Sequence, residues 1–119
     1  MNDNLGKIAE KLTTILDAWE CGAQNVQYVH EESEALLALI DWQKYPRDSE
    51  DSVILEVVAQ LDILNQQLII HSDIPAIKQF LNEGRLNPLL AWSNWEKYWN
   101  NVDYEKRKAM LRNHTYYCT

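Results

Sequence analysis

Hydrophobic positions in the N-terminal third of the chain recur at steps of three and four, the spacing of one face of an α-helix. Between residues 4 and about 21 the apolar side chains share a face, and Gly22 suits the C-terminal stop. A second amphipathic pattern begins at Val26. It should run out near Tyr45, because Pro46 disfavours helix in the residue before it. The pattern therefore predicts two successive amphipathic helices.

The most apolar stretch is VILEVVAQLDILNQQLII, residues 53–70. A strand could start with VILEVV, but the helical pattern continues past it for further turns, so we expect one long helix. Asp48 or Ser49 can cap its N-terminus, where the helix dipole also favours the acidic Glu50 and Asp51. The width of its apolar stripe predicts that this helix is the central one.

Three shorter helices complete the predicted fold. Ser72 or Asp73 can cap a fourth helix, with Gly84 just past its end. Asn87 opens a fifth, and Asp103 opens a sixth that fades toward the C-terminus. The pattern shows no internal repeat and only short connections, so it predicts an all-α, compact single-domain bundle of about five to six helices.

Three tryptophans fall close together on the predicted fifth helix. Trp92, Trp95 and Trp99 occupy an arc of about 60° on a helical wheel, with polar residues opposite. So tight a stripe is typical of a core, with the indole N–H groups at the bundle edge. Alternatively the stripe forms a homodimer seam, which requires Trp95 or Trp99 to be exposed in the monomer. The sequence leaves monomer and homodimer undecided.

The charge is distributed unevenly along the 119 residues, a length that fits one domain, 1–119. The formal net charge is −7, with 14 acidic and 4 basic residues in 1–73 but 4 acidic and 7 basic residues in 74–119. An acidic field of this kind repels nucleic acid and anionic membrane surfaces and attracts basic partners. The apolar runs are also too short to span a membrane.

Cysteine usage and the N-terminus bear on the compartment. The first residues show no basic region followed by an apolar run, so no secretory signal is visible. Cys21 and Cys118 lie far apart without a CxxC spacing, and isolated thiols in such a chain more often stay reduced. We therefore expect a cytoplasmic protein.

Motifs for cofactor or metal chemistry are mostly missing. The chain has no GxGxxG, P-loop, GxSxG or HExxH pattern, and its three glycines are too scattered to cradle a phosphate. No histidine has a glutamate three residues before it, as a di-iron bundle requires, and Val53 stands where a calcium loop needs glycine. His30, Glu31 and Glu34 share a helix face, but no second ligand cluster accompanies them. We expect no cofactor and no metal.

The C-terminal stretch RKAMLRNHTYY contains one candidate catalytic pattern. Arg107 is followed after six residues by His114, with Tyr116 close by. This resembles the Arg-x(4–6)-His signature of the HEPN family, small helical proteins many of which are metal-independent RNases. The resemblance implies an arginine that binds phosphate and a histidine that assists proton transfer. An ordinary amphipathic terminal helix with an exposed arginine explains the same residues.

Acidic groups on the first three predicted helices and the loop PRDSED suggest a binding protein. As a whole, the chain resembles the small acidic helical immunity proteins of bacterial toxin systems, such as those against nuclease colicins and contact-dependent inhibition toxins. The resemblance implies a protein without enzymatic activity that covers the active site of a cognate basic toxin domain. The expected partner-binding residues are Glu31, Glu32, Glu34, Asp48, Glu50, Asp51, Tyr28, Trp42 and Tyr45.

Overall fold

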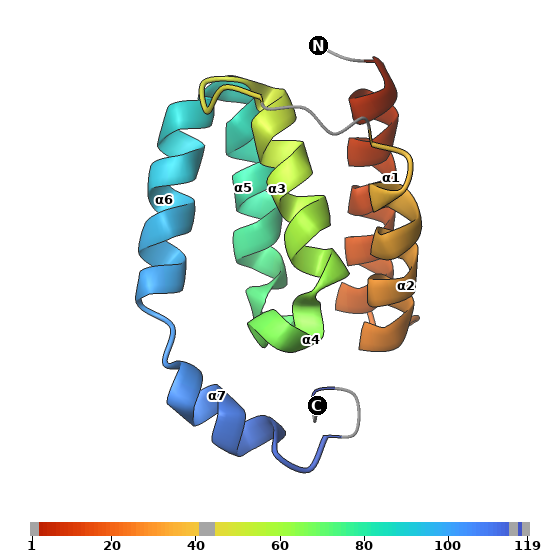
Figure 1. Cartoon of the computed structure of the whole chain (residues 1–119), viewed down its shortest axis with the longest axis vertical. Helices are drawn as coiled ribbons and strands as arrows, with labels where there is room; N and C mark the ends of the chain where they lie inside the picture. The colour runs from red at the N-terminus through yellow and green to blue at the C-terminus, as the bar shows by residue number, and fades with distance from the viewer. Residues whose placement is uncertain (1–2, 41–44, 115–116, 118–119) are drawn as a thin grey trace.

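The computed structural model describes residues 3–40, 45–114 and 117, and these ranges contain seven α-helices (Figure 1). They are α1 (Asp3–Glu20), α2 (Val26–Leu37), α3 (Glu50–Asp62), α4 (Leu64–Gln67), α5 (Ile74–Leu86), α6 (Pro88–Asn100) and α7 (Tyr104–Leu111), with a 3-10 turn, η1 (His71–Asp73), before α5. The described ranges contain no strand, which confirms the predicted all-α class.

Five of the helices, α1, α2, α3, α5 and α6, lie alongside one another, and α7 lies beyond the lower end of α6 (Figure 1). Helix α3 contacts α1, α2, α5 and α6, so the predicted central position of this segment is confirmed. The radius of gyration of 14.1 Å is close to the roughly 13.5 Å expected of a compact domain of this length. The chain therefore forms one compact bundle.

The core is built from the apolar faces that the sequence pattern predicts. Helix α1 buries six side chains: Leu5, Ile8, Leu12, Ile15, Leu16 and Trp19. Helix α3 buries five apolar side chains: Val53, Ile54, Val57, Val58 and Leu61. Each fully buried side chain of this size contributes about 1.5–3 kcal/mol relative to exposure, and these two faces hold half of the buried hydrophobic side chains of the described residues.

Side-chain caps begin four of the helices. Ser49 accepts a hydrogen bond from the Ser52 N–H at the start of α3, which settles the choice between Asp48 and Ser49. Asn87 and Asp103 cap α6 and α7, as the sequence predicts. Asn25 caps α2 in the same way. Each such cap is typically worth about 1 kcal/mol of helix stability.

The predicted continuous helix over residues 53–70 is wrong, because the chain breaks it twice. Helix α3 ends at Asp62, and the short α4 ends at Gln67, before Leu68, whose backbone is left-handed with φ 56° and ψ 41°. This conformation costs a residue other than glycine about 1–2 kcal/mol. The Arg107 guanidinium donates to the Leu68 carbonyl at 2.9 Å, and the following Ile69 is buried. These tertiary contacts stabilise the non-helical conformation at Leu68. Because α4 is separate from α3, the described residues form seven helices where five to six were expected.

Two predicted helix ends are also wrong. Helix α2 ends at Leu37, well before Tyr45, and the next residues close tighter turns, with Ile40 N–H bonded to the Leu37 carbonyl. Gly84 lies inside α5 instead of after it. A Cβ atom at Gly84 would lie 2.7 Å from Val53 Cγ1, so this glycine permits close packing of α5 on α3.

Candidate functional site

The tryptophan stripe of α6 divides between core and surface. Trp95 is 5% exposed and stacks on Phe80 of α5 at 4.2 Å between ring centroids, so its predicted core position is confirmed. Trp92 and Trp99 are partly buried and pack against that core. The indole N–H groups of Trp92 and Trp95 donate to Ser52 and Glu56 of α3, both at 3.0 Å. With Trp95 buried inside the chain, it is not available as a dimer seam.

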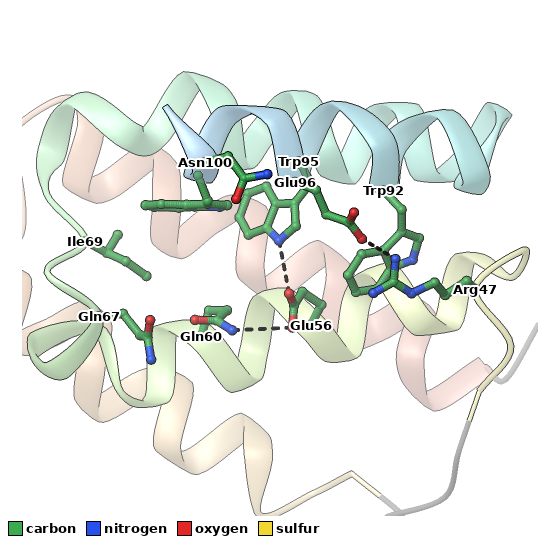
Figure 2. Close-up of a pocket in the computed structure, with 10 residues that line it drawn as sticks. Arg47, Glu56, Gln60, Gln67, Ile69, Trp92, Trp95, Glu96 and Asn100 are labelled. Carbon is green, nitrogen blue, oxygen red and sulfur yellow. Dashed lines mark hydrogen bonds and ion pairs between the residues drawn. The ribbon is translucent and has the colours of Figure 1, made fainter. Parts of the chain in front are cut away.

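A groove of about 390 Å³ runs between α3 and α6 (Figure 2). Among the residues that line this α3–α6 groove are Arg47, Glu56, Gln60, Trp92, Trp95, Glu96 and Trp99. Its volume falls in the range of ordinary small-ligand pockets. The buried indole N–H of Trp99 has no hydrogen-bond partner among the described residues. The groove thus combines aromatic walls with carboxylates from both helices.

Arg47, from the segment before α3, already occupies part of this groove. Its guanidinium carbon lies 4.3 Å from the centroid of the Trp92 ring and its Nη1 pairs with the Glu96 carboxylate (Figure 2). The Arg47 and Glu96 side chains are 61% and 50% exposed, so this pair contributes about 0–1 kcal/mol. The groove therefore holds a cation by weak, water-accessible contacts.

Three of the predicted partner-binding carboxylates lie together on α2. Glu31, Glu32 and Glu34 are exposed, and Gln27 donates a hydrogen bond to Glu31. Tyr28, partly buried, joins Glu32 in lining a cavity of about 420 Å³ between α1 and α2. Glu32 thus lies on the side of α2 toward α1, whereas Glu34 lies beside His30 and Asp62 on the side toward α3. We call the three exposed carboxylates of Glu31, Glu32 and Glu34 together the α2 acidic face.

The second predicted acidic group, Asp48, Glu50 and Asp51, lies at the N-terminus of α3 and not on α2. Glu50 is 3.9 Å from Arg85 Nε, and one buried oxygen of Asp51 has no hydrogen-bond partner among the described residues. Asp48 is exposed in the turn before the Ser49 cap. Tyr45 packs against the core as a partly buried side chain.

Trp42 lies outside the described residues, and so do Tyr116 and Cys118. Cys21 is exposed at the end of α1, with its thiol 3.5 Å from the Ala18 carbonyl. The roles that the sequence suggests for Trp42, Tyr116 and Cys118 therefore stay predictions.

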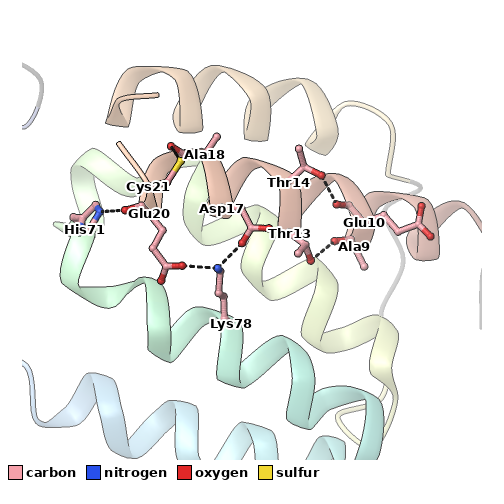
Figure 3. Close-up of polar contacts among 10 residues, drawn as sticks. All are labelled: Ala9, Glu10, Thr13, Thr14, Asp17, Ala18, Glu20, Cys21, His71 and Lys78. Carbon is pink, nitrogen blue, oxygen red and sulfur yellow. Dashed lines mark hydrogen bonds and ion pairs between the residues drawn. The ribbon is translucent and has the colours of Figure 1, made fainter. Parts of the chain in front are cut away.

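Other acidic residues of the N-terminal part are neutralised within the fold. Lys78 of α5 bonds to both Asp17 and Glu20 of α1, at 2.7 Å for Glu20 (Figure 3). These hydrogen bonds raise the pKa of Lys78, first through Asp17 and then through Glu20. The His71 ring donates to the Glu20 carbonyl at 3.1 Å and adds a second link from the end of α1 to η1 (Figure 3).

Arg107 of α7 is held in a buried network instead of facing solvent. Its two terminal nitrogens donate to the two carboxylate oxygens of Asp73, both at 2.7 Å, and the Asp73 side chain is fully buried. The Tyr98 hydroxyl and the Ile70 N–H also donate to this carboxylate. Burial, followed by the hydrogen bond to Asp73, raises the pKa of Tyr98 to about 12. Hydrogen bonding to Asp73 raises the pKa of Arg107.

This network bears on the RNase alternative. A phosphate-binding arginine must present its N–H donors to a ligand, whereas Arg107 directs Nη1 to Leu68 and Asp73 and Nη2 to Asp73. His114 follows the turn after α7, with its ring centroid 4.9 Å from that of Tyr117. The contacts of Arg107 are those of a structural anchor joining α7 to the bundle. They do not favour the catalytic role implied by the HEPN resemblance.

One cluster could hold a divalent ion. His30 and Glu34 of α2 and Asp62 of α3 each offer one ligand atom, and these atoms all lie within 4.8 Å of one another. In the sequence, His30, Glu31 and Glu34 share a helix face and no metal is expected there; in the structure, Asp62 of the neighbouring helix joins His30 and Glu34, and Glu31 is not part of the cluster. The contribution of α3 depends on tertiary packing, so no spacing in the sequence could have indicated it.

No family model, curated protein or solved structure matches the chain. No described helix combines the length and apolar character needed to cross a membrane. The function must therefore be inferred from the residues themselves.

Proposed function

We propose that this protein is an immunity-type binding protein that neutralises a basic toxin domain through the α2 acidic face. The observation that carries the proposal is the state of its carboxylates. Glu31, Glu32 and Glu34 are exposed, and no Lys, Arg or His nitrogen of the described residues forms an ion pair with them. By contrast, Asp17 and Glu20 share Lys78. Within the part of the chain that the structure describes, the α2 acidic face is thus a group of exposed carboxylates that form no ion pair.

Physical considerations connect this surface to capture of a cationic protein. Residues 1–73 carry an excess of ten acidic over basic residues. Such a field raises association rates with an oppositely charged partner by factors of about 10 to 1,000 at low salt. Bound carboxylates would occupy the cationic site where a nuclease toxin holds the phosphates of its substrate, and would thereby block it.

The proposal is tested by capture followed by protection. Immobilised protein is exposed to a lysate of its source cells at low salt, and retained proteins are identified and expressed with or without this chain. We expect a basic protein that arrests growth alone and is tolerated when this chain is coexpressed. A retained protein that is harmless alone, or equally toxic with this chain present, would overturn the proposal.

Matched variants locate the interaction on α2. Glu31→Lys, Glu32→Lys and Glu34→Lys each reverse one exposed charge, and Glu105→Lys makes the same change at an 86% exposed site on α7. Each α2 reversal should weaken partner binding about tenfold, with Glu105→Lys close to wild type. Equal effects of all four variants would show a response to net charge alone and would contradict a defined α2 surface.

A further inference from the structure

The α3–α6 groove has the chemistry of a site for a planar cation. The face of Trp92 forms one wall, and Glu96 stands beside it on the same helix (Figure 2). Glu56 lies on the opposite helix, where Trp95 and Gln60 donate to its carboxylate. A ring face and carboxylates together favour a guanidinium over an ammonium, because a guanidinium stacks and pairs at once.

Arg47 shows that the groove accepts such a group. Its guanidinium contacts both the Trp92 ring face and the Glu96 carboxylate. Arg47 itself lies on the connecting segment before α3 and not on α3 or α6. The high exposure of this pair means that water screens it, so its removal costs the fold little. The same contacts strengthen when a partner excludes water, since cation–π attraction rises from about 0.5–1 to about 2 kcal/mol on desolvation.

We propose that the α3–α6 groove receives an arginine side chain of the basic protein partner, and that Arg47 occupies the site until the partner displaces it. This inference rests on the proposed function, because it takes the occupant from that partner. The α2 acidic face would attract the partner over long range, and the groove would fix one of its arginines. Exposed carboxylates raise the association rate, and contacts in a desolvated aromatic pocket slow the dissociation of the complex.

The test uses a hexa-arginine peptide as the probe and the indole N–H signals of ¹⁵N-labelled protein as the readout. We expect the peptide to shift the signals of Trp92 and Trp95. Arg47→Ala should bind it about three- to fivefold more tightly, because the internal competitor is gone. Glu96→Gln should weaken binding by a similar factor. A hexalysine peptide of equal charge should gain less from Arg47→Ala.

Several results would overturn the inference. They are an unchanged or weaker affinity of Arg47→Ala, peptide shifts confined to α2, and equal gains for hexalysine. Saturation by free argininamide at micromolar concentration would instead identify a small-molecule site and would also overturn it. The triple reversal of Glu31, Glu32 and Glu34 leaves every groove residue in place. It therefore tests the proposed function separately, whereas Arg47→Ala and Glu96→Gln test only the groove.

Discussion

Replacing Arg107 by alanine should destabilise the fold strongly. The Asp73 carboxylate is completely buried and accepts hydrogen bonds from Ile70, Tyr98 and both terminal nitrogens of Arg107. The variant removes the countercharge and two of these donors. Leaving one member of a buried pair uncompensated typically costs about 3–5 kcal/mol. The Leu68 carbonyl also loses its donor at the strained end of α4.

The effect is measured by urea denaturation followed by far-ultraviolet circular dichroism and tryptophan fluorescence. For a domain of this size, about 4 °C of Tm accompanies each kcal/mol, so we also expect Tm to fall by about 12–20 °C. Arg85→Ala is the matched control, because Arg85 is 73% exposed and 3.9 Å from Glu50, and it should lose less than about 1 kcal/mol.

A double variant separates the pair from its surroundings. Asp73→Ala/Arg107→Ala should lose less stability than the two single variants added together, because neither charge is then left alone in the interior. A loss of less than about 0.5 kcal/mol for Arg107→Ala would refute the structural role. Arg107 would then be considered again as an arginine that binds a ligand.

Three further results are expected. Gly84→Ala should lower stability by about 1–3 kcal/mol in urea denaturation despite its better helix propensity, because the new Cβ meets Val53 at 2.7 Å; a stabilised variant would contradict this packing. Stability should fall as pH rises from about 10 to about 12, since Tyr98 keeps its proton to about pH 12 when folded but ionises near pH 10 when unfolded, and Tyr98→Phe should flatten that part of the curve. His114→Ala should leave RNA as intact as wild type does in a fluorescent cleavage assay; cleavage by wild type alone would support the HEPN alternative.

The sequence predicts those parts of the fold that depend on neighbouring residues. The buried face of α1 follows from its three- and four-residue spacing, and the caps Asn87 and Asp103 act on N–H groups three residues away. The break at Leu68 escapes prediction because its donor, Arg107, lies 39 residues later. Gly84 resembles a helix stop in sequence, and only its contact with α3 shows why it lies inside a helix.

The candidate site also has one part that the sequence predicts and one part that depends on tertiary packing. The exposure of Glu31, Glu32 and Glu34 is predictable, because charged side chains on the polar face of an amphipathic helix stay in water. The α3–α6 groove is not predictable, since it depends on how α6 packs on α5 and on a contact between residues 49 positions apart, Arg47 and Glu96.

The most direct measurement is the affinity of the captured basic partner for wild type and for Glu31→Lys/Glu32→Lys/Glu34→Lys, at about 0.05 M and about 1 M salt. We expect tight binding by wild type at low salt, a large loss at high salt where the Debye length shrinks to about 3 Å, and weak binding by the triple variant under both conditions. Circular dichroism should show the same helical fold for both proteins. Equal affinities of the two folded proteins at low salt would contradict the α2 acidic face as the site of recognition.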